Sequence, residues 1–255
     1  MLLNYKITGQ GNPVFLLHGL FGAKENLGMI ARPLSNNYQT IAVDLRNHGG
    51  SFHDPEMNYQ VMAEDVVALM DHLDISDTAL IGHSMGGKVA MKLALDFPDC
   101  ISQLVVMDIA HHAYPPHHQK IMDGLRVLDK TALAGRNQAD EILINYEPDL
   151  PTRQFLLTNL VRDGQQFKLR LNVEALASNQ IAISSPVSGK PYTGRVLLLR
   201  GGNSNYVKDT SLAEFKMLFP NSRLVTIANA GHMPHVEKTA EVVTAISEFL
   251  QGGTT

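Results

Sequence analysis

The sequence predicts an α/β fold, in which a mostly parallel sheet carries helices on both faces and a helical cap inserted at one edge. Short continuous apolar runs recur along the chain, and such runs are typical of strands that are covered on both faces. Segments with apolar residues at helical spacing lie between these runs, and this alternation favours parallel strands. Over residues 110–194 the apolar runs stop and amphipathic helical segments replace them.

The first part of the chain supplies five expected strands, one at the sheet edge and four buried. These strands are predicted at 5–8, 14–17, 40–43, 79–81 and 101–107. Between them, apolar residues recur every three or four positions, which predicts helices at 26–34, 59–73 and 86–95. Strand and helix therefore alternate up to residue 109.

The later part of the chain divides into an insertion and the end of the core. The insertion is predicted to hold helices at 120–128, 137–146, 152–162 and 172–183, with one short alternating strand at 167–171. The core resumes with strands at 195–199 and 224–227 and helices at 208–219 and 241–250. We therefore expect a core of 1–109 and 195–255, and a cap of 110–194 over the carboxyl ends of the strands, where such sheets bind ligands.

Composition limits the classes of partner and compartment. The chain has 255 residues, of which 44% are hydrophobic, enough for one sizeable core. A net charge of −4 without a basic patch argues against a nucleic-acid partner. With a single cysteine, Cys100, no internal disulfide forms. The chain shows no signal-like N-terminus and no apolar run of membrane length, so we expect a cytoplasmic protein without a membrane partner.

Ser84 is the candidate nucleophile. It lies in the stretch Gly82-His83-Ser84-Met85-Gly86, between a predicted strand and a predicted helix. A G-x-S-x-G in this setting places the serine on a sharp turn, with backbone N–H groups of the helix N-terminus beside it. A glycine-rich turn with an incidental serine is the alternative, but the flanking elements favour a nucleophile.

Four motifs, taken together and in this order, resemble those of the α/β-hydrolase superfamily and, more narrowly, of the small YbfF-type bacterial esterases. They are HGLFG at 18–22, DLRNHGGS at 44–51, GHSMGG at 82–87 and GH at 231–232. The resemblance covers most of the chain and is weakest in the cap. It implies hydrolysis of short acyl esters and acyl-CoA thioesters, with a small-molecule substrate and no cofactor or metal.

His232 is the expected general base. The order of catalytic residues in this fold is serine, acid, histidine, so the base comes late in the chain. His232 follows Gly231 just after the last predicted strand, at the position that the resemblance implies, and His235 is the alternative. The side chain of His83 is expected to point away from the serine and to pack.

The acid is expected at Asp108. The loop at 200–206, where most of these hydrolases carry an aspartate, holds amides and no carboxylate before Asp209. An amide does not stabilise the imidazolium that forms when the histidine takes a proton. The resemblance to YbfF-type esterases implies that Asp108, at the end of the strand over 101–107, reaches the same histidine, while Asp209 remains the alternative.

The oxyanion donors are expected to be the N–H of Met85, which follows the nucleophile, and the N–H of Leu20, at the position that the resemblance implies. The alternative is that residues 18–22 form only a tight turn after the strand, without a catalytic role. The side chains of Leu20 and Met85 then line an acyl pocket with Phe21, a substrate-binding candidate, and their bulk predicts short acyl chains.

Other polar clusters receive plainer interpretations. Four histidines at 111, 112, 117 and 118 lack cysteine or carboxylate partners at metal-ligand spacing, so a solvated loop and no metal site are expected. Asp44, Arg46 and His48 are expected to brace a loop. The predicted activity is that of a serine esterase working through an acyl-enzyme. A lyase that uses the same residues without an acyl-enzyme, and a non-catalytic small-molecule receptor, are the alternatives.

Overall fold

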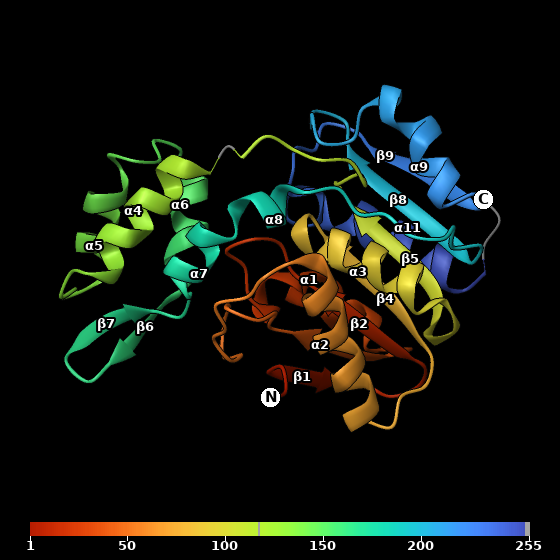
Figure 1. Ribbon diagram of the computed structural model, residues 1–255, viewed down its shortest axis with the longest axis horizontal. Helices are drawn as coiled ribbons and strands as arrows, with labels where there is room; N and C mark the ends of the chain where they lie inside the picture. The colour runs from red at the N-terminus through yellow and green to blue at the C-terminus, as the bar shows by residue number, and fades with distance from the viewer. Residues whose placement is uncertain (117, 253–255) are drawn as a thin grey trace.

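Within residues 1–116 and 118–252, which the computed structural model describes, a seven-stranded sheet runs through the core (Figure 1). Its order is β1-β3-β2-β4-β5-β8-β9. The first strand is antiparallel to β3, and the other strands are parallel to their neighbours. The strands are β1 (Tyr5–Thr8), β2 (Pro13–Leu17), β3 (Gln39–Val43), β4 (Thr78–His83), β5 (Ile101–Met107), β8 (Arg195–Gly201) and β9 (Ser222–Ile227). The predicted α/β fold class is confirmed.

Helices of the core cover both faces of this sheet. In Figure 1, α3 lies in front of the sheet and α11 behind it. The core helices are α1 (Gly28–Leu34), α2 (Tyr59–His72), α3 (Met85–Asp96), α9 (Leu212–Leu218), α10 (Pro234–Glu237) and α11 (Thr239–Leu250), with short 3-10 turns at Lys24–Leu27, Pro98–Cys100 and Asp209–Ser211. The turns at Lys24–Leu27 and Asp209–Ser211 lie at the start of the segments predicted as single helices over 26–34 and 208–219.

The buried strands divide their side chains between two cores. In β2, Phe15 and Leu17 join the cluster that includes residues of α2 and α3, whereas Val14 and Leu16 join the cluster under α1 and α11. Successive side chains of a strand point to opposite faces. Because both faces are covered, every position must be apolar, which explains the continuous runs in the sequence.

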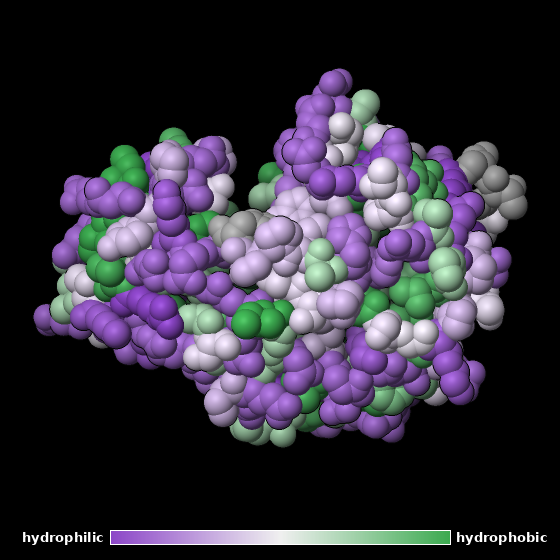
Figure 2. Space-filling view, turned by 45° about the horizontal axis from the view of Figure 1, so that its top comes forward, coloured by the Kyte–Doolittle hydropathy of each residue, from purple (hydrophilic) through white to green (hydrophobic). Residues whose placement is uncertain are grey.

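The chain between β5 and β8 forms a lobe at one end of the molecule, at the left of Figure 1. It contains α4 (Gln119–Asp129), α5 (Arg136–Leu143), α6 (Leu150–Leu157), the hairpin β6 (Leu160–Asp163) and β7 (Gln166–Leu169), α7 (Val173–Ser178) and α8 (Gln180–Ser184). We call the segment 110–194 the cap. Figure 2 shows a notch between the cap lobe and the core along the upper edge.

Two expectations for the cap are wrong. The helix predicted over 152–162 ends at Leu157, and its last residues belong to β6. The chain reverses at Gly164, whose φ of 63° suits a tight hairpin turn, so that Leu160 pairs with Leu169. The helix predicted over 172–183 is two helices, α7 and α8, separated at Asn179. No helix among the described residues is long and apolar enough to cross a bilayer.

Candidate active site

Ser84 occupies the tight turn between β4 and α3. Its φ of 51° and ψ of −120° lie in a region that non-glycine residues rarely adopt. The turn requires glycines around it: a Cβ at Gly82 would lie 2.3 Å from the Gly86 oxygen, and one at Gly86 would lie 2.2 Å from the Leu17 oxygen. This close packing fixes the serine at the carboxyl edge of the sheet.

The three residues expected to form a triad lie in hydrogen-bonding contact. Ser84 Oγ is 3.0 Å from His232 Nε2, and His232 Nδ1 is 2.8 Å from Asp108 Oδ2. The carboxylate accepts, so Nδ1 carries a hydrogen, and in the neutral ring Nε2 is left to accept the hydroxyl hydrogen of Ser84. The arrangement allows the histidine to take that proton as the hydroxyl attacks.

Asp108 is fully buried, and its carboxylate has several donors. Oδ1 accepts from the N–H of Gly201 at 2.9 Å, and Oδ2 accepts from the hydroxyl of Ser204 at 2.5 Å as well as from His232. Sheet register causes this placement, because Met107 pairs with Leu199 across β5 and β8. The loop in which most of these hydrolases would carry the acid therefore supplies donors to an acid on the neighbouring strand.

Asp209, the alternative acid, lies elsewhere. Its side chain is 80% exposed and forms an ion pair with Arg200 at 2.5 Å. It lies in the 3-10 turn before α9, so the expected position near the start of a surface helix is correct. The geometry thus favours Asp108 over Asp209 as the partner of His232.

Two residues that sequence reasoning did not assign to the site hold His232. The ring of Tyr206 stacks on the His232 ring at 3.8 Å and 16°. His83 Nε2 lies 2.7 Å from the main-chain oxygen of His232, and because that oxygen only accepts, the His83 ring donates. Burial, reinforced by His235 and His232, holds the pKa of His83 well below its usual value. His83 therefore acts as a neutral brace, which is more than the packing role expected.

His235, the alternative base, is buried behind the site. Its ring lies 4.5 Å from that of His83. Burial, with a smaller effect of His232, lowers the pKa of His235 to about 4. The hydroxyl of Ser84 instead donates to Nε2 of His232.

Hydrogen bonds hold the turn at 18–22 in place. Phe21 has a φ of 62° and donates its N–H to His48 Nε2 at 3.2 Å, and Gly22 donates to the oxygen of Gly19 at 3.0 Å. Among the described residues, the N–H groups of Leu20 and Met85 have no hydrogen-bond partner. Both are therefore available to a forming anion.

His48 is suited to hold this turn as a neutral acceptor. It is fully buried, and its Nδ1 donates to the oxygen of Arg46 at 2.9 Å, which leaves Nε2 to accept from Phe21. Burial and then the nearby His18 lower the pKa of His48 to about 3. The ring stays uncharged near neutral pH, so its hydrogen-bond directions do not change.

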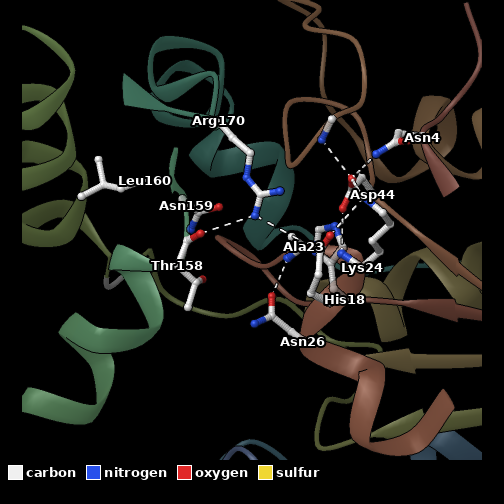
Figure 3. A network of polar contacts seen from close by, with 12 residues as sticks. Asn4, His18, Ala23, Lys24, Asn26, Asp44, Thr158, Asn159, Leu160 and Arg170 are labelled. Atoms are coloured by element: carbon white, nitrogen blue, oxygen red, sulfur yellow. Dashed lines mark hydrogen bonds and ion pairs between the residues drawn. The ribbon is translucent and has the colours of Figure 1, made fainter. Parts of the chain in front are cut away.

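Asp44 forms the second brace beneath the turn (Figure 3). Its buried carboxylate accepts from the main-chain N–H and the ammonium of Lys24, the N–H of Gly50 and the amide of Asn4. Burial opposes the charge, but the hydrogen bonds from Gly50 and Lys24 outweigh it, and the pKa of Asp44 is lowered. The loop-bracing role expected from the sequence agrees with these contacts.

The cap reaches the same turn through a buried amide. Asn159 donates from Nδ2 to the oxygen of Phe21 at 2.7 Å and to that of Leu156 at 3.1 Å. Beside it, Arg170 lies between the oxygen of Thr158, at 3.4 Å, and the carboxylate of Glu25, at 3.8 Å (Figure 3). The position of the cap is thereby coupled to the turn that carries Leu20.

Two cavities meet at Ser84. The smaller has a volume of about 60 Å³ and the larger about 510 Å³. Both are lined by Leu20, Ser84, His118 and Tyr206. Met85 lines the smaller cavity, whereas Phe21 and His232 line the larger one. Phe21 thus shares the larger cavity with Leu20 but not with Met85, which was also expected to line the same pocket.

The described histidines near the cap entry were expected to lie in a solvated loop. Among the described residues, no group of three or more potential ligands could hold a metal ion. The expected solvated loop is wrong for His111, which is 9% exposed and lies 3.6 Å from Glu214. His117 lies outside the described residues.

Comparison with known proteins places the chain among hydrolases. A family model described as alpha/beta hydrolase fold matches residues 12–136. Esterase YbfF of Escherichia coli is 38% identical over 94% of this chain and 93% of its own length. A Mus musculus protein named sn-1-specific diacylglycerol lipase ABHD11 is 38% identical over 93% of this chain and 80% of its own length.

A solved structure called a marine microorganism esterase is also similar. It superposes with a TM-score of 0.94 and 32% sequence identity, covering 97% of this chain and 99% of that one. The resemblance to YbfF-type esterases inferred from the four motifs is confirmed. The chain belongs to the α/β-hydrolase family, beside members named as esterases and lipases.

Proposed function

We propose that the protein is a serine carboxylic-ester hydrolase that works through an acyl-enzyme. Ser84 attacks the acyl carbon while His232 takes its proton, and Asp108 orients the ring and balances its charge. His232 then protonates the departing alcohol or thiol, and water releases the acyl group by the same steps in reverse. The observation that carries the proposal is the continuous Ser84–His232–Asp108 hydrogen-bond chain.

The free N–H groups of Leu20 and Met85 supply the oxyanion hole. A tetrahedral intermediate on Ser84 needs donors beside the nucleophile that are already in place and not engaged elsewhere. The hydrogen bond from Phe21 to His48 holds the turn in that conformation. No cofactor takes part in this mechanism.

The two cavities divide the substrate between them. The leaving group receives its proton from His232, so it must lie in the cavity that His232 lines, which is the larger one. The acyl group then occupies the smaller cavity, next to Met85 and Leu20. At about 60 Å³ this cavity holds roughly four to six water-sized groups, which favours short acyl chains. Phe21 contacts the leaving group in this arrangement.

Labelling of the nucleophile tests the mechanism. A fluorophosphonate should modify the wild-type protein at Ser84, identified by peptide mass spectrometry, and should leave a Ser84→Ala control unlabelled. An aryl acetate should give a rapid burst of phenol where deacylation is slower than acylation, and added hydroxylamine should take the acetyl group from Ser84 as acetohydroxamate. A folded protein that shows neither label nor turnover would instead be a receptor, and turnover without a trappable acyl-enzyme would indicate a lyase-type mechanism.

A substrate series tests the acyl preference. We expect butyryl and acetyl esters to have higher kcat/KM than dodecanoyl esters, and short acyl-CoA thioesters to be hydrolysed as well. A diacylglycerol emulsion belongs in the series, because the mouse relative is named for that substrate. Faster release of long-chain fatty acid than of butyrate would contradict the assignment of the acyl group to the smaller cavity.

A further inference from the structure

Lys88 places a buried cation in the wall of the smaller cavity. It lies on α3, one helical turn beyond Ser84, and donates its main-chain N–H to the Ser84 oxygen at 3.1 Å. Ser84 precedes the first residue of α3, and its side chain and that of Lys88 border the same cavity. Lys88 is 1% exposed, yet it lines the cavity that Ser84 also lines.

The ammonium of Lys88 is held by oxygens and aromatic rings. Nζ donates to the main-chain oxygens of His112 at 2.7 Å and Ser185 at 2.6 Å. It also lies 5.4 Å from the ring centre of Tyr59 and 4.9 Å from that of Tyr114. An ammonium has three donors, and these carbonyls occupy two of them.

A compensating negative charge is missing around Lys88. No carboxylate among the described residues lies within ion-pair distance of its Nζ. The nearby carboxylate of Glu214 pairs with His111. Burial accordingly lowers the pKa of Lys88 to about 7. A buried cation without a counter-ion is unfavourable, which a bound anion would correct.

A purely structural role explains only part of this arrangement. The two carbonyls belong to the segments that enter and leave the cap, so Lys88 ties both to the nucleophile helix. Hydrogen bonds alone would hold the two segments to the helix, and this role does not require a cavity beside the ammonium. The remaining donor, the missing counter-ion and the adjoining cavity together indicate a ligand group.

We propose that Lys88 is a specificity-determining residue that binds a carboxylate at the far end of the acyl group, so that the site takes half-esters or half-thioesters of short dicarboxylic acids. This inference rests on the proposed esterase function and names its substrate class. The carboxylate accepts the third N–H of Lys88 and neutralises its charge. A succinyl group has five non-hydrogen atoms beyond the reacting carbonyl, which agrees with room for roughly four to six water-sized groups.

Pairs of ethyl esters of equal shape test the proposal. Monoethyl succinate ends in a carboxylate where ethyl 4-methylpentanoate ends in an isopropyl group of similar shape. Both release ethanol, so one coupled assay measures both reactions. Monoethyl malonate and monoethyl glutarate, each with its own branched neutral partner, cover shorter and longer acyl groups. For at least one length, wild type should prefer the half-ester by roughly ten- to a hundredfold in kcat/KM, the range expected for a charge-assisted hydrogen bond.

Substitution of Lys88 should abolish the preference for the half-ester. Lys88→Met keeps the length of the side chain and removes the charge, so the ratio of kcat/KM for the half-ester to that for its neutral partner should fall to about one or below, whatever the loss of the two carbonyl contacts does to both rates. Lys92→Met is the matched control, because Lys92 lies one turn further along α3 and pairs with Asp96 at 2.9 Å. The control should keep the wild-type ratio.

The outcomes separate this inference from the esterase proposal. If wild type hydrolyses each neutral ester at least as fast as its half-ester, Lys88 is a structural tie and the inference fails, while the esterase function stands. If neither kind of ester is hydrolysed, the esterase function fails and this inference with it. Should Lys88→Met not fold by circular dichroism, the wild-type ratios alone decide.

Discussion

The core and the cap contribute to the site in different ways. The core supplies Ser84 and Asp108 from the ends of the neighbouring strands β4 and β5, whose register fixes their separation, and His232 from the loop after β9. The cap supplies cavity wall, and it touches the catalytic edge through individual polar contacts such as that of Asn159 with Phe21. The core thus fixes the positions of the catalytic side chains, whereas the choice of substrate depends on contacts between core and cap.

This difference separates two classes of mutational effect. A change at a strand end should abolish turnover of every ester, since each ester uses the same nucleophile, base and acid. A change at a contact between the parts should alter rates moderately or selectively. The four predictions below follow this order, from the largest expected effect to the smallest.

Removal of the nucleophile should have the largest effect. Ser84→Ala should lower kcat for an aryl butyrate by about 10⁴–10⁶-fold, as loss of a triad serine does elsewhere. Thermal unfolding followed by circular dichroism should show a folded protein, because within the described part of the chain the hydroxyl has one hydrogen bond, to His232. Near-wild-type turnover in that folded variant would exclude Ser84 as the nucleophile and with it the proposed mechanism.

The acid should follow, with an internal comparison. Asp108→Asn keeps the shape of the side chain but removes the charge that stabilises the imidazolium, so kcat should fall on the order of 10⁴-fold. Asp209→Asn, at an exposed ion pair, should stay within about twofold of wild type. If Asp209→Asn proves the slower variant, the acid must be reassigned to the loop after β8.

A contact between cap and core should have an intermediate effect. Asn159→Ala removes the donor to the Phe21 oxygen and loosens the turn that carries the Leu20 N–H. We expect kcat to fall on the order of 30-fold with little change in KM, less than the 10²–10³-fold cost of deleting an oxyanion donor. Asn145→Ala, on an exposed part of the cap, is the control. Equal activity of both variants would mean that the cap contact does not position the turn.

The smallest effect concerns pH and Lys88. Because the pKa of Lys88 is about 7, it is mostly charged at about pH 6 and mostly neutral at about pH 8, while a half-ester carboxylate stays ionised at both. The kcat/KM ratio of half-ester to neutral ester should therefore fall as pH rises, by at most about tenfold. Because both esters use the same general base, any effect of pH on that base is common to both rates and cancels in their ratio.

The titratable groups around the ammonium include Tyr59, Tyr114, His111 and His112, and Glu214 pairs with His111. Burial, and to a smaller extent Lys88, lowers the pKa values of both histidines. Lys88→Met keeps all of these groups, so a pH effect that they cause should persist in that variant. A ratio that stays constant in wild type, or that changes equally in Lys88→Met, would show that another group controls it.

Residues at strand ends were the most predictable part of the site. The order of Ser84, an acid and His232 along the chain, with apolar runs before them, was enough because the carboxyl ends of parallel strands meet at one edge. The prediction of Asp108 depends on the resemblance to YbfF-type esterases as well as on the lack of a charge in the loop after β8. Their catalytic roles remain predictions until the variants above are measured.

Contacts between distant segments were not predictable from local pattern. The bond from His83 to the His232 oxygen joins residues far apart in sequence, and the stack of Tyr206 on His232 depends on how one loop folds back. In the cap, the turn at Gly164 was overlooked because helical spacing continued past Leu157. One usable signal for Lys88 existed, since a lysine four residues after Ser84 falls in an apolar part of the segment that forms α3.

The backbone at Ser84 has a consequence for how such a protein evolves. Its φ of 51°, like the 49° of Asp108, is unfavourable for a side-chain-bearing residue by about 1–3 kcal/mol. Glycine adopts this conformation without strain. A lineage released from the need to hydrolyse esters would thus gain folding stability by losing its nucleophile. Ancestral reconstruction or stability-based selection on this scaffold would then favour inactive proteins unless catalysis is selected at the same time.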